Sequence, residues 1–386
     1  MPWSDPALLT AVFILLVWIG AAVFVMPGNR RLRRLTELRA PEPAAWPRVS
    51  VVIAARNEAT TVGRALPTLF AVDYPDLEFI AVNDRSEDAT GAILDRLAAN
   101  EPRLRVVHVS ALPPGWIGKN HALHLGAAQA AGEWILFTDA DVHFLAPDVL
   151  RRAIAYAQAQ SLDHLTAVPS LSGHGHGLGI CVNAFSFAFS VWLQPWLVRQ
   201  PRRRAHAGVG AFNLVRTPAY RKLGGHAPLR LRPDDDIKLG KLMKTGGPSE
   251  FVLGADALEV EWYDSVGGMI RGMMKNAYAG GEYRCWLPPL AAGLTGLLYL
   301  WPLAALALTA GPVWWLYAAS VVLMLLLGCD QTRFTGGRWW HGLLLPLGMA
   351  VFAFIILRSQ WVAHRTGGIT WRGTHYPLHE LKANRL

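Results

Sequence analysis

The chain has 386 residues, of which 52% are hydrophobic and only 17% are charged. A mean hydropathy of +0.23 excludes an ordinary soluble enzyme and indicates membrane segments beside a folded domain. The net charge of +9 suits an anionic membrane surface or phosphorylated substrates. No nucleic-acid partner is expected, because apolar segments occupy much of the chain and no nucleic-acid-binding motif is recognisable in it. Three scattered cysteines indicate a reduced, cytoplasm-facing folded part.

An almost uncharged apolar run, Leu8 to Met26, is long enough to span a bilayer. The basic cluster Asn29–Arg34 follows at once, and the positive-inside rule places this cluster in the cytoplasm and the N-terminus outside. A cleaved signal peptide is the alternative, but no basic region precedes the run. We therefore expect a retained anchor over residues 1–28 and a basic juxtamembrane linker over residues 29–47.

From residue 48 the pattern changes to alternating strands and helices. This order predicts an α/β fold, Rossmann-like, with a mostly parallel sheet and its ligand-binding loops along one edge. The expected domain covers residues 48–264. Its first strands are expected at Val49–Ala55, Leu77–Val82, Leu104–Val109 and Trp134–Thr138, and its first helices at Thr60–Phe70, Asp88–Ala99 and His121–Ala131.

Two acids, Asp139 and Asp141, follow the buried strand that ends at Thr138. Carboxylates at the C-terminal end of a parallel strand lie where open α/β sheets bind ligands. If the chain bends there, both can reach one Mg²⁺ or Mn²⁺ ion, cations that suit carboxylates together with substrate phosphates. A solvated turn is the alternative, because Asp is common wherever strands end.

Three adjacent acids, Asp234, Asp235 and Asp236, occur at the start of an expected helix. Their mutual repulsion is unfavourable unless cations or a substrate require them. The alternative is a structural one, because acidic residues are also stabilised by the dipole at a helix N-terminus.

The stretch Ile180–Leu197 is strongly apolar and aromatic, and Pro195 interrupts it. It predicts a helix on the membrane or at an apolar acceptor site, with a core helix as the alternative. The preceding loop carries His174 and His176, but two donors alone do not predict a metal site.

The C-terminal part begins with a basic amphipathic helix at the membrane interface, over residues 265–286. Residues 287–360 carry the apolar spans Leu290–Thr309, Val313–Gly328 and Leu343–Leu357, and residues 361–386 form a tail. Three spans would place the tail outside, whereas its Arg and His residues favour the inside. One segment is therefore a candidate for a re-entrant or interfacial position.

Several short motifs, in a fixed order, resemble family 2 glycosyltransferases of the GT-A fold. The resemblance covers roughly Arg48 to Arg284 and is strongest to membrane-bound members, those similar to ceramide glucosyltransferases and the hopanoid- or carotenoid-associated enzymes of bacteria. The motifs are Val51–Glu58, Asn83–Ser86, Gly115–Lys119, Asp139–Asp141, Asp235–Asp236 and, near Tyr376, Trp371–Gly373.

The resemblance implies how a nucleotide-sugar donor is bound. The loop that contains Ala54, Arg56, Asn57 and Glu58, together with Asp84, would hold the base and ribose. Lys119 would place a cation near the phosphates. Asp139 and Asp141 would bind the donor through Mg²⁺ or Mn²⁺ bridging its diphosphate.

The resemblance also implies an inverting displacement that needs one base for the acceptor hydroxyl. Asp235 and Asp236, with Leu239 three residues on, match the family's acid pair, so Asp236 is the expected base and Asp235 its neighbour. Asp234 is the alternative if the register slips. The Gln-x-x-Arg-Trp motif of many processive or ceramide-type relatives is missing, which argues against a polymer synthase.

The sequence therefore predicts a multi-pass protein of the bacterial inner membrane, with a cytoplasmic GT-A domain flanked by transmembrane helices. The expected donor is a nucleotide-sugar, in particular a UDP-sugar, and the expected acceptor is a membrane lipid. Two alternatives remain open. One is an inactive membrane scaffold that binds lipid; the other is a nucleotidyltransferase, although Ala54–Glu58 stands where a glycine-rich phosphate loop would be expected.

Overall fold

The computed structural model describes residues 5–173 and 175–386. The first four residues of the expected anchor, and His174, thus lie outside the described residues. The chain forms two compact units. We call them the sheet unit (residues 32–172, 195–261 and 379–386) and the helical unit (residues 1–31, 173–194 and 262–378), and describe each by itself.

The sheet unit is built on a seven-stranded sheet in the order β3-β2-β1-β4-β8-β6-β9. Every neighbouring pair is parallel except the two that β8 makes, with β4 and with β6. This confirms the predicted α/β fold with a mostly parallel sheet. The strands are β1 (Val49–Ala55), β2 (Leu77–Asp84), β3 (Leu104–Val109), β4 (Trp134–Asp139), β6 (His164–Val168), β8 (Asn213–Arg216) and β9 (Ser249–Leu253).

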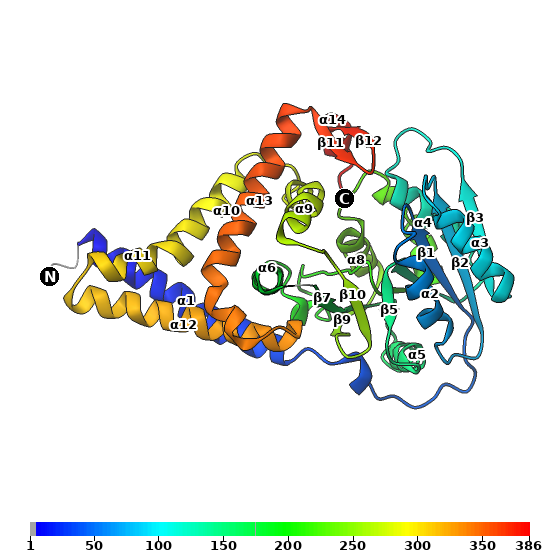
Figure 1. The fold of residues 1–386 in the computed structure, drawn as a ribbon. Helices are drawn as coiled ribbons and strands as arrows, with labels where there is room; N and C mark the ends of the chain where they lie inside the picture. The colour runs from blue at the N-terminus through cyan, green and yellow to red at the C-terminus, as the bar shows by residue number, and fades with distance from the viewer. Residues whose placement is uncertain (1–4, 174) are drawn as a thin grey trace. The chain divides into compact units, whose positions relative to one another are not determined.

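Helices cover both faces of this sheet (Figure 1). On one face, Val51 and Ile53 of β1 pack with α2, α3 and α5; on the other, Val52 packs with α4, α7 and α8. The alternation of side chains along a strand explains why neighbouring residues of β1 reach opposite cores. The helices are α2 (Val62–Phe70), α3 (Thr90–Asn100), α4 (Gly118–Gln129), α5 (Val149–Ala159), α7 (Thr217–Lys222) and α8 (Asp235–Gly246).

Smaller elements complete the sheet unit. A second sheet has the order β5-β10-β7. The last eight residues also belong to this unit, although the chain reaches them from the helical unit. These elements are β5 (Val142–Phe144), β7 (Ser170–Ser172), β10 (Leu258–Glu261), the short helices η1 (Leu35–Glu37), η2 (Pro195–Leu197) and η3 (Ala227–Leu229), and α14 (Leu378–Ala383), whose first residue lies in the helical unit.

The helical unit consists of long apolar helices and one hairpin. In the described residues, five helical segments are long and apolar enough to cross a membrane: 6–30, 176–197, 287–308, 311–335 and 339–365. The elements are α1 (Pro6–Arg30), α6 (His176–Leu193), α9 (Val266–Gly280), α10 (Leu287–Thr295), η4 (Gly296–Leu300), α11 (Trp301–Leu308), α12 (Gly311–Thr335), η5 (Trp339–Leu344), α13 (Leu345–Arg365), β11 (Gly368–Trp371) and β12 (Thr374–Pro377).

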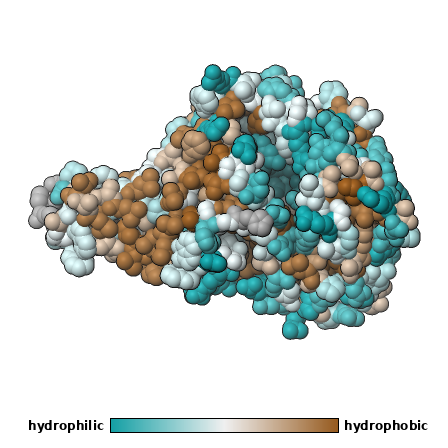
Figure 2. All heavy atoms as spheres, in the orientation of Figure 1, coloured by the Kyte–Doolittle hydropathy of each residue, from teal (hydrophilic) through white to brown (hydrophobic). Residues whose placement is uncertain are grey.

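A shared apolar core joins α1, α6, α11, α12 and α13 within the helical unit. The outward faces of these helices are also apolar: Val23 is 71% exposed and Trp315 is 69% exposed. Figure 2 shows this hydrophobic surface over the region of α1, α11 and α12. Large apolar side chains left exposed on long helices are what a lipid-facing surface requires.

Candidate active site

The loops that follow β1 and β2 are joined to each other. The main-chain N–H of Asn57 donates to Ser86 Oγ (3.0 Å), and the Asn57 side-chain oxygen accepts from Glu87 N–H (2.8 Å). Glu58 N–H donates to Thr90 Oγ1 (2.7 Å). Asn57 has a φ of 54°, in the left-handed region that Asn tolerates better than most residues. The predicted nucleotide loop is thus held in one conformation at the C-terminal edge of the sheet.

Asp84, at the end of β2, lies buried between two arginines. Arg85 donates to both of its oxygens (2.8 and 3.1 Å), and Arg56 Nη1 lies 3.7 Å from Oδ2. Gly118 begins α4 so close to Asp84 that a Cβ at this position would overlap the carboxylate. The structure therefore brings together Arg56 and Asp84, two of the residues predicted to hold the donor.

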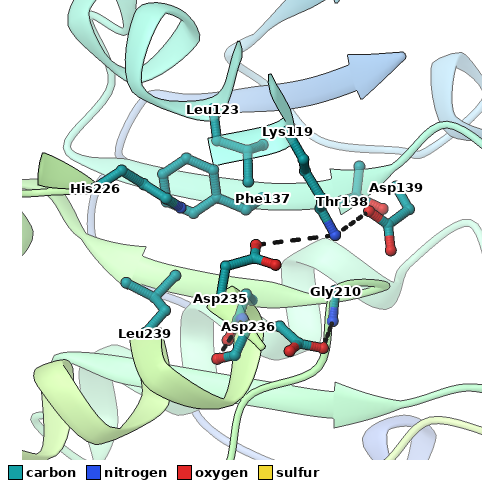
Figure 3. A pocket seen from close by; sticks show the side chains of 11 residues that line it. Lys119, Leu123, Phe137, Thr138, Asp139, Gly210, His226, Asp235, Asp236 and Leu239 are labelled. Carbon is teal, nitrogen blue, oxygen red and sulfur yellow. Dashed lines mark hydrogen bonds and ion pairs between the residues drawn. The ribbon is translucent and has the colours of Figure 1, made fainter. Parts of the chain in front are cut away.

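Lys119 lies in the first turn of α4 and reaches the end of β4. Its Nζ is 2.8 Å from Asp139 Oδ1 and 3.9 Å from Asp235 Oδ2 (Figure 3). Burial alone would lower the pKa of Lys119, but Asp139, Asp235 and Asp236 outweigh it and raise this pKa well above its ordinary value. Lys119 is therefore a permanent cation between the two acidic motifs.

Asp141 lies in an environment of accumulated negative charge. Burial, followed by the charges of Asp139 and Glu58, raises the pKa of Asp141 to about 7. In the described residues, no group of three or more His, Cys, Asp or Glu side chains is arranged to hold a metal ion. Two carboxylates nevertheless fit a Mg²⁺ or Mn²⁺ ion that takes its other ligands from substrate phosphates and water, and such an ion would relieve the repulsion at Asp141.

Asp234 is engaged as a structural residue. Arg232 Nε and Nη2 donate to its two oxygens (both 2.9 Å), and Lys238 Nζ lies 3.6 Å away. Arg232 is 1% exposed and Asp234 is 3% exposed. A carboxylate paired twice in a buried position is poorly placed to accept a proton from substrate. The contacts of Asp234 therefore favour Asp235 and Asp236 over the slipped register.

Asp236 is only partly covered, and both of its oxygens are oriented by main-chain amides. Ile237 N–H donates to Oδ1 (2.8 Å) and Gly210 N–H donates to Oδ2 (3.1 Å). Burial raises the pKa of Asp236, Lys119 and the Ile237 amide oppose that rise, and Asp139 and Asp234 add to it. A carboxylate with a raised pKa is a stronger base.

The segment before β8 approaches the site through glycines. A Cβ at Gly208 would overlap the carbonyl of Asp236, and a Cβ at Gly210 would lie 2.5 Å from Asp139 Oδ2. The sequence analysis assigned these two glycines no role. Two glycines spaced by one residue just before a strand are the signal that a close backbone approach was required.

Lys119, Asp139, Gly210, Asp235 and Asp236 line one small pocket with an apolar wall (Figure 3), whereas Asp84 and Asp141 are not among its lining residues. His226 belongs to this wall; burial lowers its pKa to about 3, so the ring is neutral, and its Nδ1 lies 2.6 Å from the Tyr220 hydroxyl. It is therefore not a competing proton acceptor. The lining residues are Lys119, Leu123, Phe137, Thr138, Asp139, Gly210, Asn213, His226, Asp235, Asp236 and Leu239.

Residues 50–175 match the model of the family described as glycosyl transferase family 2. A beta-monoglucosyldiacylglycerol synthase of Synechocystis is 34% identical over 166 residues, which cover 39% of this chain but only 34% of the synthase. A 4,4'-diaponeurosporenoate glycosyltransferase of Staphylococcus aureus is 24% identical over 400 residues, which cover 98% of this chain and 99% of that enzyme.

A solved structure is similar in fold. The mannosyltransferase PcManGT of Pyrobaculum calidifontis, solved in complex with GDP-Man and Mn²⁺, aligns with a TM-score of 0.60 and 18% identity, over 91% of this chain and 99% of that one. With the family match, this likeness identifies the sheet unit as a GT-A-like α/β fold.

Proposed function

We propose that this chain, whose residues 50–175 match the glycosyl transferase family 2 model, is a glycosyltransferase that carries out an inverting, metal-assisted transfer of a sugar from a nucleotide-sugar to a membrane lipid. One observation carries the proposal. Lys119 and Asp139, at the C-terminal end of the sheet, line the same pocket as Asp235 and Asp236, at the start of α8. A cation, a carboxylate proposed as a metal ligand and a carboxylate proposed as the base thus face one small space.

The donor would lie along the edge where β1, β2 and β4 end. The loop Ala54–Glu58 and Asp84 would hold the base and ribose. Mg²⁺ or Mn²⁺, bound by Asp139 and Asp141 with the diphosphate, would neutralise charge on the leaving group. The Mn²⁺ in the PcManGT complex supports a divalent ion. We expect a UDP-sugar; GDP-Man in that same complex makes a GDP-sugar the competing donor.

Asp236 would act as the general base. Its carboxylate takes the proton of the acceptor hydroxyl as that oxygen bonds to the anomeric carbon and the bond to the nucleoside diphosphate breaks. The amides of Ile237 and Gly210 fix both oxygens, and the raised pKa strengthens the base. Lys119 would stay protonated and hold Asp139 and Asp235 in place while it faces the phosphates.

A lipid acceptor is supported by the helical unit and by the relatives. The long helices of the helical unit expose apolar side chains such as Val23 and Trp315. One relative is named for a glucosyldiacylglycerol and the other for diaponeurosporenoate. We therefore propose a membrane-embedded acceptor that presents an oxygen nucleophile.

The path of the chain supports a membrane orientation. α6 leaves the sheet unit after residue 172, and the chain returns at residue 195; β6 before it and β8 after it are hydrogen-bonded neighbours. One sheet lies on one side of a membrane, so α6 does not cross alone. Residues 262–378 also leave the sheet unit and return to it. The number of complete membrane crossings made by residues 262–378 is therefore even.

Contacts within the helical unit support a proposal for which helices cross the membrane. Arg30 at the end of α1 pairs with Asp330 near the end of α12 (2.8 Å), and Asn29 donates to Gln331 (2.9 Å). Trp18 of α1 donates to the carbonyl of Leu298 in η4 (3.2 Å). We propose that α1, α10–α11 and α12 cross, that α6 and α13 are re-entrant or interfacial, and that the sheet unit is cytoplasmic, at the inner membrane.

Cysteine labelling tests this orientation. In a variant whose own cysteines are replaced, a cysteine at Ala310, in the turn between α11 and α12, should react with an impermeant thiol reagent added outside. A cysteine at Ala383 should react only after the membrane is opened. Labelling of residue 383 from outside would overturn the orientation.

The transferase proposal is tested by calorimetry of UDP and GDP binding to the purified protein, first with Mn²⁺ and then with EDTA. Metal-dependent binding of either nucleotide supports the proposal, and the nucleotide that binds more tightly identifies the class of the sugar donor. If the folded protein binds neither nucleotide, an inactive lipid-binding scaffold becomes the better account.

A further inference from the structure

The last residues of the chain pack inside the sheet unit, beside α8 (Figure 1). Leu386 packs against the buried apolar cluster that includes Leu239 and Met243 of α8 and Leu229 of η3. Lys241 of α8 donates to the main-chain oxygen of Leu386 (2.8 Å). The tail is thus attached to the helix whose first residues are Asp235 and Asp236.

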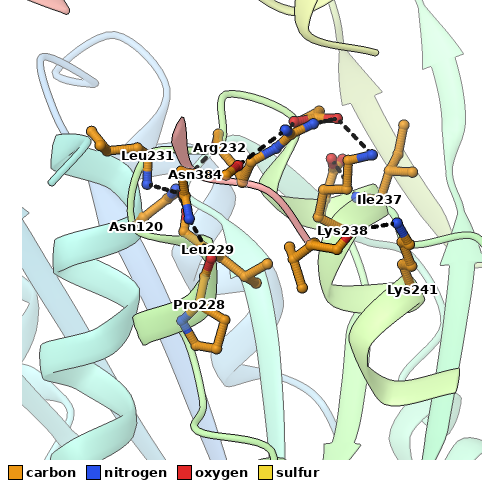
Figure 4. Close-up of polar contacts among 12 residues, drawn as sticks. Asn120, Pro228, Leu229, Leu231, Arg232, Ile237, Lys238, Lys241 and Asn384 are labelled. Carbon is orange, nitrogen blue, oxygen red and sulfur yellow. Dashed lines mark hydrogen bonds and ion pairs between the residues drawn. The ribbon is translucent and has the colours of Figure 1, made fainter. Parts of the chain in front are cut away.

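Asn384 binds the segment that leads into this helix (Figure 4). Its side-chain oxygen accepts from Leu231 N–H (2.9 Å), and its side-chain nitrogen donates to the carbonyl of Pro228 (3.0 Å). Its main-chain oxygen lies 3.4 Å from Nη1 of Arg232, the residue that pairs with Asp234. An amide that donates and accepts at once fixes both sides of the turn.

The same segment is bound from a second direction by the start of α4. Asn120, which is fully buried, donates to the carbonyls of Leu229 (2.6 Å) and Arg232 (2.9 Å). Ile117 N–H donates to the carbonyl of Arg230 (2.7 Å). Residues 228–232 therefore lie between the helix turn that carries Lys119 and the tail that carries Asn384.

We propose that the tail, through Asn384, is a positioning clamp for the catalytic acids. It fixes residues 228–232, so that Arg232 stays paired with Asp234 and the start of α8 presents Asp236 to the pocket. Asn384 touches no reacting group in this arrangement; it acts through the segment that it binds. The inference rests on the proposed role of Asp236 for its functional consequence, but the clamp itself is measurable without any activity.

The test compares Asn384→Ala with Arg385→Ala, a matched control in which the neighbouring exposed side chain is removed. Hydrogen exchange of residues 228–237 should become about tenfold faster in Asn384→Ala, because two hydrogen bonds to this segment are lost. With the nucleotide-sugar selected by calorimetry at saturation and a membrane lipid extract as acceptor, kcat should fall about tenfold, while the calorimetric affinity for the nucleotide in Mn²⁺ stays within about twofold. The control should match the wild type in all three measurements.

Leu386→Ala is the second variant, to be used if Asn384→Ala does not fold. It removes only side-chain packing of the tail, and should give a smaller change in the same direction in exchange and in kcat. Exchange of residues 228–237 that equals the control in every folded tail variant would overturn the clamp. Faster exchange together with full transfer by Asp236→Asn would establish the clamp and refute the proposed base.

Discussion

The Arg232–Asp234 pair provides a stability prediction with a magnitude set by burial. Both side chains are almost fully covered, and two hydrogen bonds of 2.9 Å join them. Arg232→Met would leave Asp234 buried beside the cation Lys238, whose Nζ lies 3.6 Å from it. Breaking a buried pair from one side costs about 3–5 kcal/mol, and the remaining cation favours the lower end of this range.

The assay is thermal unfolding of the purified protein in detergent, followed by tryptophan fluorescence. A loss of about 3 kcal/mol lowers the midpoint by roughly 6–12 °C in a domain of about 200 residues. Asp234→Asn, added to Arg232→Met, removes the stranded charge and should recover part of the loss, which a double-mutant cycle measures. A shift of less than about 2 °C for Arg232→Met, or no recovery in the double variant, would refute this reasoning.

Two further predictions concern the chemistry. Asp236→Asn should lower the transfer rate by about 10²–10⁴-fold, because the general base is lost. The donor affinity measured by calorimetry should stay nearly unchanged. A parallel loss of donor affinity would mean that the base is misassigned. Because the pKa of Asp141 without metal is about 7, a proton must leave it before it can bind a cation. Mn²⁺-dependent donor affinity should thus fall as the pH drops below about 7 and level off above it. Asp141→Ala should weaken this affinity and flatten its pH dependence, and an unchanged profile would exclude Asp141 as a ligand.

The sequence located the elements that depend on local pattern. The apolar runs that end at Ala55, Val82 and Thr138 lie in the strands expected, and each strand end carries polar residues at one edge of the sheet. The start of α4 was expected at His121 and lies at Gly118 instead. Gly and Asn are weak helix formers, but here Gly118 permits close contact with Asp84, and Asn120 bonds to η3.

The parts that were not predicted depend on contacts between distant segments. The local sequence of Asn384 gives no sign that it binds the turn before α8, and the glycines at 208 and 210 reveal their role only when Asp139 and Asp236 surround them. The sequence also did not show that residues 379–386 return to the sheet unit, because this return depends on the fold and not on hydropathy.

The central claim is an inverting transfer to a lipid with Asp236 as the base. The most direct test is to incubate the purified protein with Mn²⁺, an α-linked nucleotide-sugar of the class selected by calorimetry and a membrane lipid extract, and to determine the anomeric configuration of the glycolipid by NMR. We expect a β-linked product that forms with the wild type and not with Asp236→Asn. An α-linked product, or the same product from the variant, would contradict it.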